Sequence, residues 1–278
     1  MFVVLKIINP EKGFLKRRKQ KKALDNAVLR SCPTEKGLPF YILEVLDGKR
    51  GINWKLAADK CGRYSSRIIA PRSLPLPDHA RLKRFIPISM NSVLVFNTAL
   101  KIIEKSKLVP DEICITLTDR NGVHPRDVCK ILPYASTVRV VTNHPERYAA
   151  ACSEAFEEHG ASLIIRNAYE PVSKPDIVIC CDGAVTASMK NAAIFTSKRK
   201  NGGKLVFSGS GVCLAPKHAE IISPETDPVD FAGALTELCG SREYKNAVFS
   251  QIEATCRKCE ESPPEKCLEC CCLGRINT

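Results

Sequence analysis

Six cysteines crowd near the end of the sequence, between Cys256 and Cys272. Four of them form two C-x-x-C pairs, and a loop of seven residues separates the pairs. Two such pairs supply four thiolates, which can hold one Zn²⁺ in tetrahedral geometry at about 2.3 Å. The sequence therefore predicts a structural metal site made by Cys256, Cys259, Cys267 and Cys270.

Two alternatives to zinc stay open for this tail. The same four thiolates could ligate an iron–sulfur cluster. The connecting loop is also shorter than that of a full zinc ribbon, so the tail could be a cysteine-rich end that binds metal only adventitiously. A closed four-thiolate zinc site has no open position, which makes its role structural, and Cys271 or Cys272 would remain spare and reactive.

The other nine cysteines are scattered singly or as the adjacent pair Cys180 and Cys181. The opening residues 1–8 lack the basic start and the small-residue cleavage site of an export signal, and we interpret them as a strand. No apolar run is long enough to span a bilayer. We therefore expect free thiols in a soluble cytoplasmic protein that does not contact a membrane.

Seven basic residues fall within eleven positions near the start of a chain whose formal charge is +12. They are Lys12, Lys16, Arg17, Arg18, Lys19, Lys21 and Lys22. The segment Lys16–Lys22 could neutralise phosphates, which makes nucleic acid a possible partner. The alternative is a solvated helix or loop face, and only Phe14 offers a ring for base stacking in this cluster.

From residue 91 onward, apolar runs alternate regularly with helical patterns. Expected strands cover 113–117, 137–142, 162–166, 176–181 and 204–208. Unbroken apolar strands such as 177–181 are typical of a sheet covered on both faces, and short strand–helix–strand links imply parallel pairing. We predict an α/β protein with a mostly parallel, Rossmann-like sheet.

Three regions follow from these patterns. Residues 1–88 are expected to form a smaller α+β region with the basic segment, and 89–245 the Rossmann-like α/β domain. Residues 246–278 are expected to form a Cys-rich, metal-binding tail.

Two carboxylates follow predicted strands. Asp119 comes after the first strand and Asp182 after the fourth, and ligands of open α/β sheets bind along that edge. The two could hold Mg²⁺ or act as an acid/base pair, with His124 as a further base. Turn chemistry explains the same residues, because Asp side chains hydrogen-bond to backbone amides in Asp-Arg-Asn-Gly and Asp-Gly turns.

The order of elements, with Asn143-His144-Pro145-Glu146-Arg147 opening a helix, carries a resemblance. Over about residues 91–241 the chain resembles the nucleotide-binding domain of the glutamyl-tRNA reductase and shikimate dehydrogenase group, in the NAD(P)-binding domain superfamily. The resemblance implies a glycine-rich turn after the first strand. It also implies an Asn-Arg-Thr-like step at the end of the second strand.

The glycine-rich turn is degenerate. Setting 113–116 on the family's first strand places 117–122 on the G-x-G-x-x-G turn, and only Gly122 remains. Leu117 and Asp119 stand where the turn and the close approach to pyrophosphate need glycine. A like-charge contact costs on the order of 4 kcal/mol at about 4 Å, so we expect NAD(P) to bind no tighter than about 1 mM.

The resemblance also points to Asn143, which lies near the position of the ribose-contacting acid. His144 stands in place of the Arg that grips a 2′-phosphate, and a single Asn at a strand end is also a common helix cap. The candidate cofactor-binding residues are therefore Gly122, Asn143, Asp182 and Gly183, of which the last two lie at the sheet edge.

No catalytic set closes in this sequence, so catalytic residues stay unassigned and enzymatic activity stays open. The first hypothesis is a non-catalytic or regulatory protein with a degenerate nucleotide-binding-like domain and a structural metal site. The second is an NAD(P)-dependent oxidoreductase with an atypical loop. The third is a nucleic-acid-associated protein.

Overall fold

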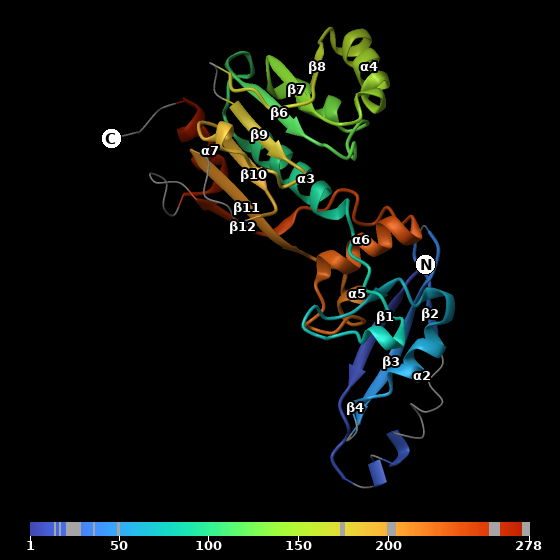
Figure 1. Ribbon diagram of the computed structural model, residues 1–278. Helices are drawn as coiled ribbons and strands as arrows, with labels where there is room; N and C mark the ends of the chain where they lie inside the picture. Colours follow the sequence, from blue (N-terminus) through green and yellow to red (C-terminus); the bar gives the residue numbers. More distant parts are fainter. Residues whose placement is uncertain are drawn as a thin grey trace. The chain divides into compact units, whose positions relative to one another are not determined.

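The computed structural model describes residues 1–13, 15–16, 18–20, 29–35, 37–48, 51–172, 176–198, 204–255 and 262–273. These residues form a mixed α/β structure with two separate sheets (Figure 1). The chain divides into two compact units. Unit 1 holds residues 1–90 and 213–245, and unit 2 holds residues 91–212 and 246–278.

Unit 2 contains a seven-stranded sheet in the order β12-β11-β10-β9-β6-β7-β8. Its strands are β6 (Cys114–Thr118), β7 (Thr137–Val141), β8 (Leu163–Arg166), β9 (Asp176–Cys180), β10 (Ala193–Thr196), β11 (Leu205–Val212) and β12 (Phe249–Thr255). All neighbours pair in parallel except β12, which is antiparallel to β11. The expected α/β fold class with a mostly parallel sheet is confirmed.

The order of this sheet reverses between β6 and β9. The chain runs outward through β6, β7 and β8, then returns to the other side of β6 and continues through β9, β10 and β11. Two neighbouring strands whose connections leave in opposite directions mark a topological switch point, where α/β sheets bind their ligands. The carboxyl ends of β6 and β9 are therefore the place to look for a site.

Apolar side chains cover the sheet on both faces, as the unbroken apolar strands predicted. On one face Val178, Ile194 and Val206 pack with Met189 and Ala192. On the other face Phe195 stacks on Phe207 with ring centroids 4.5 Å apart. The helix α3 (Met90–Lys105) runs along this second face (Figure 1), where its Thr98 hydroxyl accepts a hydrogen bond from the Phe249 amide at 3.0 Å.

The remaining helical segments of unit 2 connect the strands or follow the last of them. They are η3 (Pro110–Glu112), η4 (Val128–Tyr134), η5 (Pro145–Tyr148), α4 (Ala149–His159), η6 (Ala187–Met189) and α7 (Pro264–Leu273). The helical segment after β6, η4, is a 3-10 helix with Pro133 inside it. Proline cannot donate an amide hydrogen bond and crowds the preceding turn, which shortens this segment.

Unit 1 is built on a second sheet in the order β2-β3-β1-β5, with β4 pairing β3. Its strands are β1 (Val3–Ile8), β2 (Arg30–Cys32), β3 (Phe40–Gly48), β4 (Gly51–Ile52) and β5 (Ile68–Ile69). The helix α2 (Trp54–Cys61) begins at Asn53, whose side chain accepts from the Leu56 amide at 3.1 Å. Ala57 and Cys61 of α2 share a core with Val3 and Leu43 of the sheet.

Residues 213–245 group with the N-terminal region, which differs from the linear division expected from the sequence. They carry α5 (Pro216–Ala219) and α6 (Pro228–Cys239). Phe231 of α6 packs edge-to-face against Phe2 and Phe40, with centroids 5.9 and 5.5 Å away. An apolar helix face in a sequence shows that the helix is buried but not which sheet buries it.

Among the described residues, none of the helices has the length and apolar character needed to cross a membrane.

Candidate functional site at the switch point

The structure brings the sequence-predicted site residues of unit 2 to one sheet edge. Thr118, the last residue of β6, pairs with Val141 of β7 on one side and with Cys180 of β9 on the other. Asp119, Asn143 and the Asp182–Gly183 step follow these three strand ends directly or within three residues. The expected juxtaposition is present, and the question is what each side chain contacts.

Asp119 is turned into the protein. Its residue is 2% exposed, and its Oδ2 accepts hydrogen bonds from the His124 amide at 2.8 Å and the Tyr148 hydroxyl at 2.6 Å. Burial, together with the Asp119 carboxylate, raises the pKa of Tyr148 well above its ordinary value, which keeps the hydroxyl as a donor. The Gly122 amide donates to the Asp119 carbonyl at 3.1 Å, so the expected turn forms.

Asp182 is also used within the chain. Its Oδ1 accepts from the Ala184 amide at 2.9 Å and from the Thr118 hydroxyl at 3.1 Å. Its Oδ2 lies 3.3 Å from Nε of Arg120, and the Asp182 side chain is 8% exposed. Gly183 has a φ of 67°, which suits glycine in an Asp-Gly turn. These contacts place an ion pair at the carboxyl ends of β6 and β9.

The two carboxylates belong to no cluster of ligating side chains. In the described parts of the chain, three metal-ligating groups approach one another within 4.8 Å only at Glu154, Glu158 and His159. That group is exposed and lies at the end of α4. The geometry therefore favours turn chemistry for Asp119 and Asp182, the alternative that the sequence left open.

Gly122, the one glycine left in the loop, is explained by packing. Its φ is 61°, and a Cβ added there would lie 2.7 Å from Cδ of Arg147. The Arg147 guanidinium crosses the loop and donates from Nη1 to the Asn121 carbonyl at 3.0 Å. A left-handed residue beneath an arginine side chain favours glycine whether or not a phosphate is bound.

The loop lacks the helix amino terminus that holds pyrophosphate in dinucleotide-binding folds. In this described stretch, β6 is followed by turns and then by η4, and the residue at the start of η4 is Asp127. The neighbouring His124 ring and the Lys130 ammonium hold the pKa of Asp127 well below its usual value. A carboxylate thus stands near the position where a phosphate needs helix amides.

His124, suggested as a base from the sequence, lies in a buried contact. Its Nε2 is 2.8 Å from Oγ of Ser92, its ring stacks on Phe96, and its Nδ1 is 4.0 Å from Oδ2 of Asp127. The order serine–histidine–aspartate resembles a nucleophile set. Ser92 and His124 are only 4% and 2% exposed, and Asp127 pairs more closely with Lys130 at 2.6 Å, so the contact is structural.

Sequence reasoning missed the Ser92–His124 contact. The helix α3 begins at Met90, which places Ser92 in its first turn. A polar residue on an otherwise apolar helix face is the signal that could have found it, because a buried hydroxyl needs a partner.

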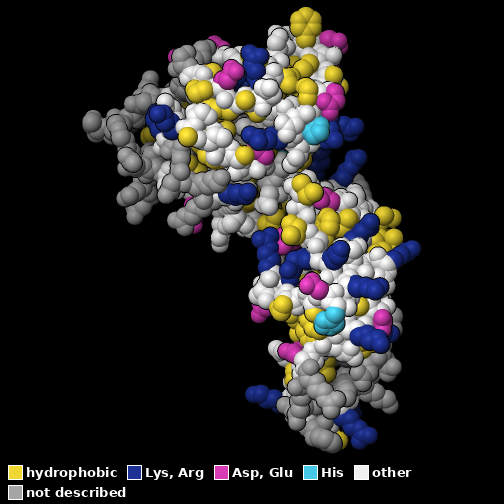
Figure 2. Space-filling model, in the orientation of Figure 1, with side chains coloured by type: hydrophobic (Ala, Val, Ile, Leu, Met, Phe, Trp, Pro, Cys, Tyr) yellow, Lys and Arg dark blue, Asp and Glu magenta, His cyan; other side chains and the backbone are white. Residues whose placement is uncertain are grey.

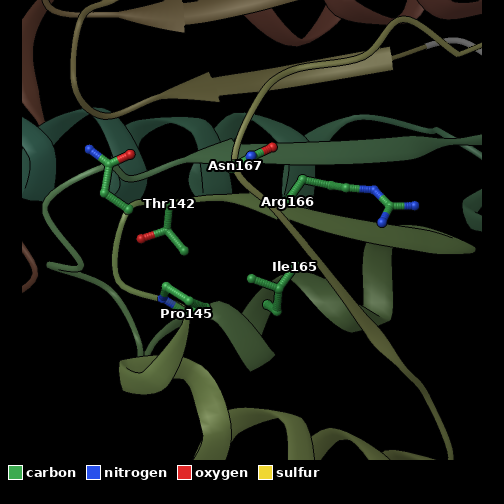
Figure 3. Close-up of a pocket in the computed structure, with 6 residues that line it drawn as sticks. Thr142, Pro145, Ile165, Arg166 and Asn167 are labelled. Atoms are coloured by element: carbon green, nitrogen blue, oxygen red, sulfur yellow. The ribbon is translucent and has the colours of Figure 1, made fainter.

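A pocket of about 590 Å³ lies beside the crevice, at the ends of β7 and β8 (Figure 3). It is lined by Thr142, Asn143, Pro145, Ile165, Arg166 and Asn167. Of the sequence-predicted residues, Asn143 lines this pocket. The expected capping contact is made by its neighbour, since the Thr142 hydroxyl accepts from the His144 amide at 3.1 Å. In Figure 3 Thr142, Pro145 and Ile165 gather on one side, and the Arg166 guanidinium extends away from them.

Half of the predicted metal site can be located. Cys256 and Cys259 lie outside the described residues. Cys267 and Cys270 lie one turn apart on α7, where Cys267 is fully buried and Cys270 is exposed. The Cys272 thiol lowers the pKa of Cys271 against the effect of burial, and Lys204 adds to the lowering. Both Cys271 and Cys272 are buried.

The basic segment near the start of the chain is described in part. Lys16, Arg18 and Lys19 are exposed, whereas Arg17, Lys21 and Lys22 lie outside the described residues.

Comparison with known proteins adds little. No protein-family model matches the chain, and no curated protein matches it in sequence. A crystal structure of L-tryptophan dehydrogenase from Nostoc punctiforme aligns with 64% of this chain at 14% identity and a TM-score of 0.23. The alignment spans 54% of that enzyme, about half its length. An alignment at this TM-score supports no statement about the fold, and the mostly parallel sheet itself defines the fold class.

Proposed function

We propose that this is a non-catalytic, regulatory protein whose Rossmann-like domain does not bind a dinucleotide in the ordinary way. One observation carries the proposal: the loop after β6 is closed on its own polar groups. The buried Asp119 carboxylate holds the amide of His124 and the hydroxyl of Tyr148. An approaching pyrophosphate would meet this carboxylate instead of free amides.

Opening the loop would be costly. A hydrogen bond to a charged group contributes roughly 1.5–3 kcal/mol, and Asp119 accepts two. The nearby Arg120–Asp182 pair would also have to separate. This cost is comparable to the binding free energy of about 4 kcal/mol that corresponds to a Kd of about 1 mM.

The adjoining pocket supports binding without chemistry. The polar side chains that line it are Thr142, Asn143, Arg166 and Asn167. These groups donate and accept hydrogen bonds, and they include no serine, cysteine, histidine or carboxylate of the kind that acts as nucleophile or general base. The pocket is therefore suited to holding a small ligand as a signal.

Isothermal titration with NAD(H) and NADP(H) tests the proposal. We expect a Kd no tighter than about 1 mM for all four. The variant Arg120→Ala removes the cover over Asp182 without touching Asp119, and it serves as a matched control that should not restore binding. Micromolar affinity of the unmodified protein would overturn the proposal in favour of an NAD(P)-dependent oxidoreductase.

We further propose that Cys256, Cys259, Cys267 and Cys270 hold one structural zinc ion, with an iron–sulfur cluster as the alternative. The support is the paired C-x-x-C spacing and the position of the second pair on one helix, α7. Four thiolates around Zn²⁺ carry a net charge of −2, which suits basic neighbours such as Lys266.

Metal analysis of protein purified without oxygen tests this second proposal. We expect about one zinc, or one cluster with its visible absorption, per chain. Cys267→Ser should release the metal and leave the sheet of unit 2 folded, whereas Cys272→Ser should retain the metal. Absence of both zinc and iron would exclude the metal site.

A further inference from the structure

The positive charge of this protein is concentrated in its first third. Residues 1–90 hold 20 of the 42 Lys and Arg but 7 of the 30 Asp and Glu, so they carry a formal charge of +13 and the rest carries −1. Figure 2 shows many dark-blue side chains on the part of the molecule that carries β1–β5. Such asymmetry indicates a polyanionic partner rather than a general solubility requirement.

Several acidic groups of unit 1 are engaged with partners within the unit. Asp227 and Asp230 pair with Arg72, and Glu35 and Glu243 pair with Lys217. The Glu237 carboxylate accepts from the amides of Ile88 and Ser89. Among the exposed basic residues of this unit that take no part in the ion pairs found for the described residues are Arg63, Arg67, Arg81 and Lys83.

Backbone pairing holds these residues close together. The Lys83 amide donates to the Ser65 carbonyl at 2.8 Å, and the Ile68 amide donates to the Lys83 carbonyl at 3.1 Å. Ile68 and Arg84 form a parallel β-bridge. Arg67 directly precedes Ile68 and Lys83 directly precedes Arg84, so the two cations lie on adjacent segments. Neighbouring like charges destabilise paired strands, so their presence needs another explanation.

Arg81, two residues before Lys83, has a φ of 54°. In the described parts of the chain it is the one non-glycine residue in the left-handed region. That conformation costs roughly 1–2 kcal/mol for a residue with a Cβ. The same conformation caps the short 3-10 helix η2 (Asp78–Ala80), where the Arg81 amide donates to the Asp78 carbonyl at 3.0 Å, and the residue is exposed.

Planar groups adjoin these cations. The Arg63 guanidinium lies 4.9 Å from the centre of the Tyr64 ring and donates to its hydroxyl at 2.6 Å. The Tyr64 ring stacks on Tyr41 with centroids 5.1 Å apart. Nucleic-acid-binding proteins stack unpaired bases on such aromatic rings and guanidinium planes.

We propose that Arg63, Tyr64, Arg67, Arg81 and Lys83, here called the basic face, bind a single-stranded nucleic acid. Arg67, Arg81 and Lys83 contact phosphates, and the Arg63–Tyr64 stack receives a base. The basic face is distinct from the Lys16–Lys22 segment and does not depend on the function of unit 2. It supplies both the charge and the planar groups, whereas the segment supplies charge alone.

A lipid surface is the competing partner. Ile86 and Ile88 follow Lys83 in the chain and are 67% and 74% exposed, and apolar side chains beside cations also suit anionic membranes. The Arg63–Tyr64–Tyr41 stack favours the nucleic acid, because a lipid headgroup offers no ring to stack on it.

Fluorescence anisotropy of a labelled oligouridylate, titrated with the full protein over a range of salt concentrations, tests the proposal. The three cations that contact phosphates predict a slope of log K against log salt of about −2, at roughly −0.7 per contact. Arg67→Ala with Lys83→Ala should reduce this slope by about 1.4. Replacing two exposed lysines of unit 2, Lys101→Ala with Lys190→Ala, removes the same charge and should change nothing.

The stack has its own pair of variants. Tyr64→Ala should weaken binding about tenfold or more with an unchanged slope, and Tyr64→Phe should retain the affinity because it keeps the ring. Thermal unfolding checks that each variant is folded. If Tyr64→Ala does not fold, the variant Arg67→Ala with Lys83→Ala still tests the proposal, because it leaves the Arg63–Tyr64 stack intact.

The remaining outcomes overturn the proposal. Absence of oligonucleotide binding at low salt would do so. Binding that the Arg67/Lys83 variant leaves unchanged, or that is equal for the Tyr64→Ala and Tyr64→Phe proteins, would reduce the effect to nonspecific charge. If the protein binds phosphatidylserine vesicles through the basic face and does not bind the oligonucleotide, the partner of the basic face is a membrane.

Discussion

Tyr148 and Asp119 decide the character of the loop after β6. The tyrosine is fully buried, and its hydroxyl lies 2.6 Å from the carboxylate. A short hydrogen bond between two buried groups is hard to exchange for a ligand contact, because either partner left alone would remain desolvated. The residue types that suggested phosphate chemistry are thus used to hold the loop in place.

Gly122→Ala should destabilise the protein by about 1–2 kcal/mol, because alanine is unfavourable at positive φ and its Cβ would meet Cδ of Arg147. Chemical unfolding of the variant measures this loss. In an Arg147→Ala background, the part of this loss that comes from the steric clash should disappear, and only the part that comes from the positive φ should remain. Equal losses in the two backgrounds would show that the arginine does not constrain the loop.

His218 makes the stability of unit 1 depend on pH. Its residue is 2% exposed, its Nδ1 lies 2.8 Å from the Tyr244 hydroxyl, and burial lowers its pKa despite the nearby Glu243. The unfolded chain takes up this proton near its ordinary pKa of about 6.5, before the folded chain does. The contribution of His218 to the free energy of unfolding should therefore be fully present above about pH 6.5, and it should fall as the pH drops below about 6.5.

Urea unfolding of the native protein and His218→Asn between pH 5 and pH 8 measures this effect. One proton contributes at most about 1.4 kcal/mol per pH unit, and the native protein should lose more stability than the variant below about pH 6.5. Parallel curves for the two proteins would mean that His218 does not titrate differently on folding.

Only some of the site could be read from residue types. The sequence placed Asp119, Asn143 and Asp182 at one sheet edge because strand ends meet there, and the structure agrees. It could not show where the carboxylates point, since that depends on Tyr148, which reaches Asp119 from the end of η5, and on Arg120, which reaches Asp182 from the loop after β6.

At the scale of elements, a buried polar network joins three neighbouring strands. Arg139 of β7 donates from Nη2 to the Thr116 hydroxyl of β6 at 2.6 Å and to Oδ2 of Asp176 in β9 at 2.9 Å. The Tyr169 hydroxyl also donates to Oδ2 of Asp176 at 2.7 Å. Because each group needs its partners in a low-dielectric setting, the network favours this strand order and register over alternatives.

Asp176→Asn should destabilise unit 2 by about 3–5 kcal/mol, because it leaves the Arg139 cation buried without a counter-charge. The double replacement Arg139→Met with Asp176→Leu should cost less than the single change, since it removes both charges. Chemical unfolding followed by circular dichroism compares the three proteins. A double variant less stable than Asp176→Asn would contradict this account.

The strands of unit 2 were largely predictable because their apolar runs are unbroken. The five expected strands are present, with ends that differ by up to four residues. Two were missed. The strand β10 is only four residues long, and β12 is an edge strand with an exposed, polar sequence, so neither gives a strong apolar signal. Gly209 of β11 lies where a Cβ would overlap the Phe249 ring of β12.

At the scale of the whole molecule, the chain passes between the two units three times, after residues 90, 212 and 245. The core of unit 1 therefore depends on a segment far along the chain. Phe2 and Phe40 stack at 5.2 Å on the sheet, and Phe231 of α6 covers them. Burial of such rings contributes several kcal/mol.

A protein of residues 1–90 alone should fail to unfold cooperatively, because the face around Phe2 and Phe40 would lack α6. Joining 1–90 to 213–245 through a short Gly–Ser linker should restore a cooperative thermal transition. In the full chain, Phe231→Ala should cost about 3–5 kcal/mol. A cooperative transition for 1–90 without the second segment would show that the sheet and α2 suffice.

The late arrival of α6 has a consequence during synthesis. At about 5–20 residues per second, the ribosome needs roughly 10–30 s to proceed from residue 90 to residue 245. Throughout that interval the aromatic face of the first sheet has no covering helix, while the strands of the other unit emerge beside it. The nascent chain therefore presents an apolar surface that suits a chaperone, and folding of the first unit ends only after most of the second has been made.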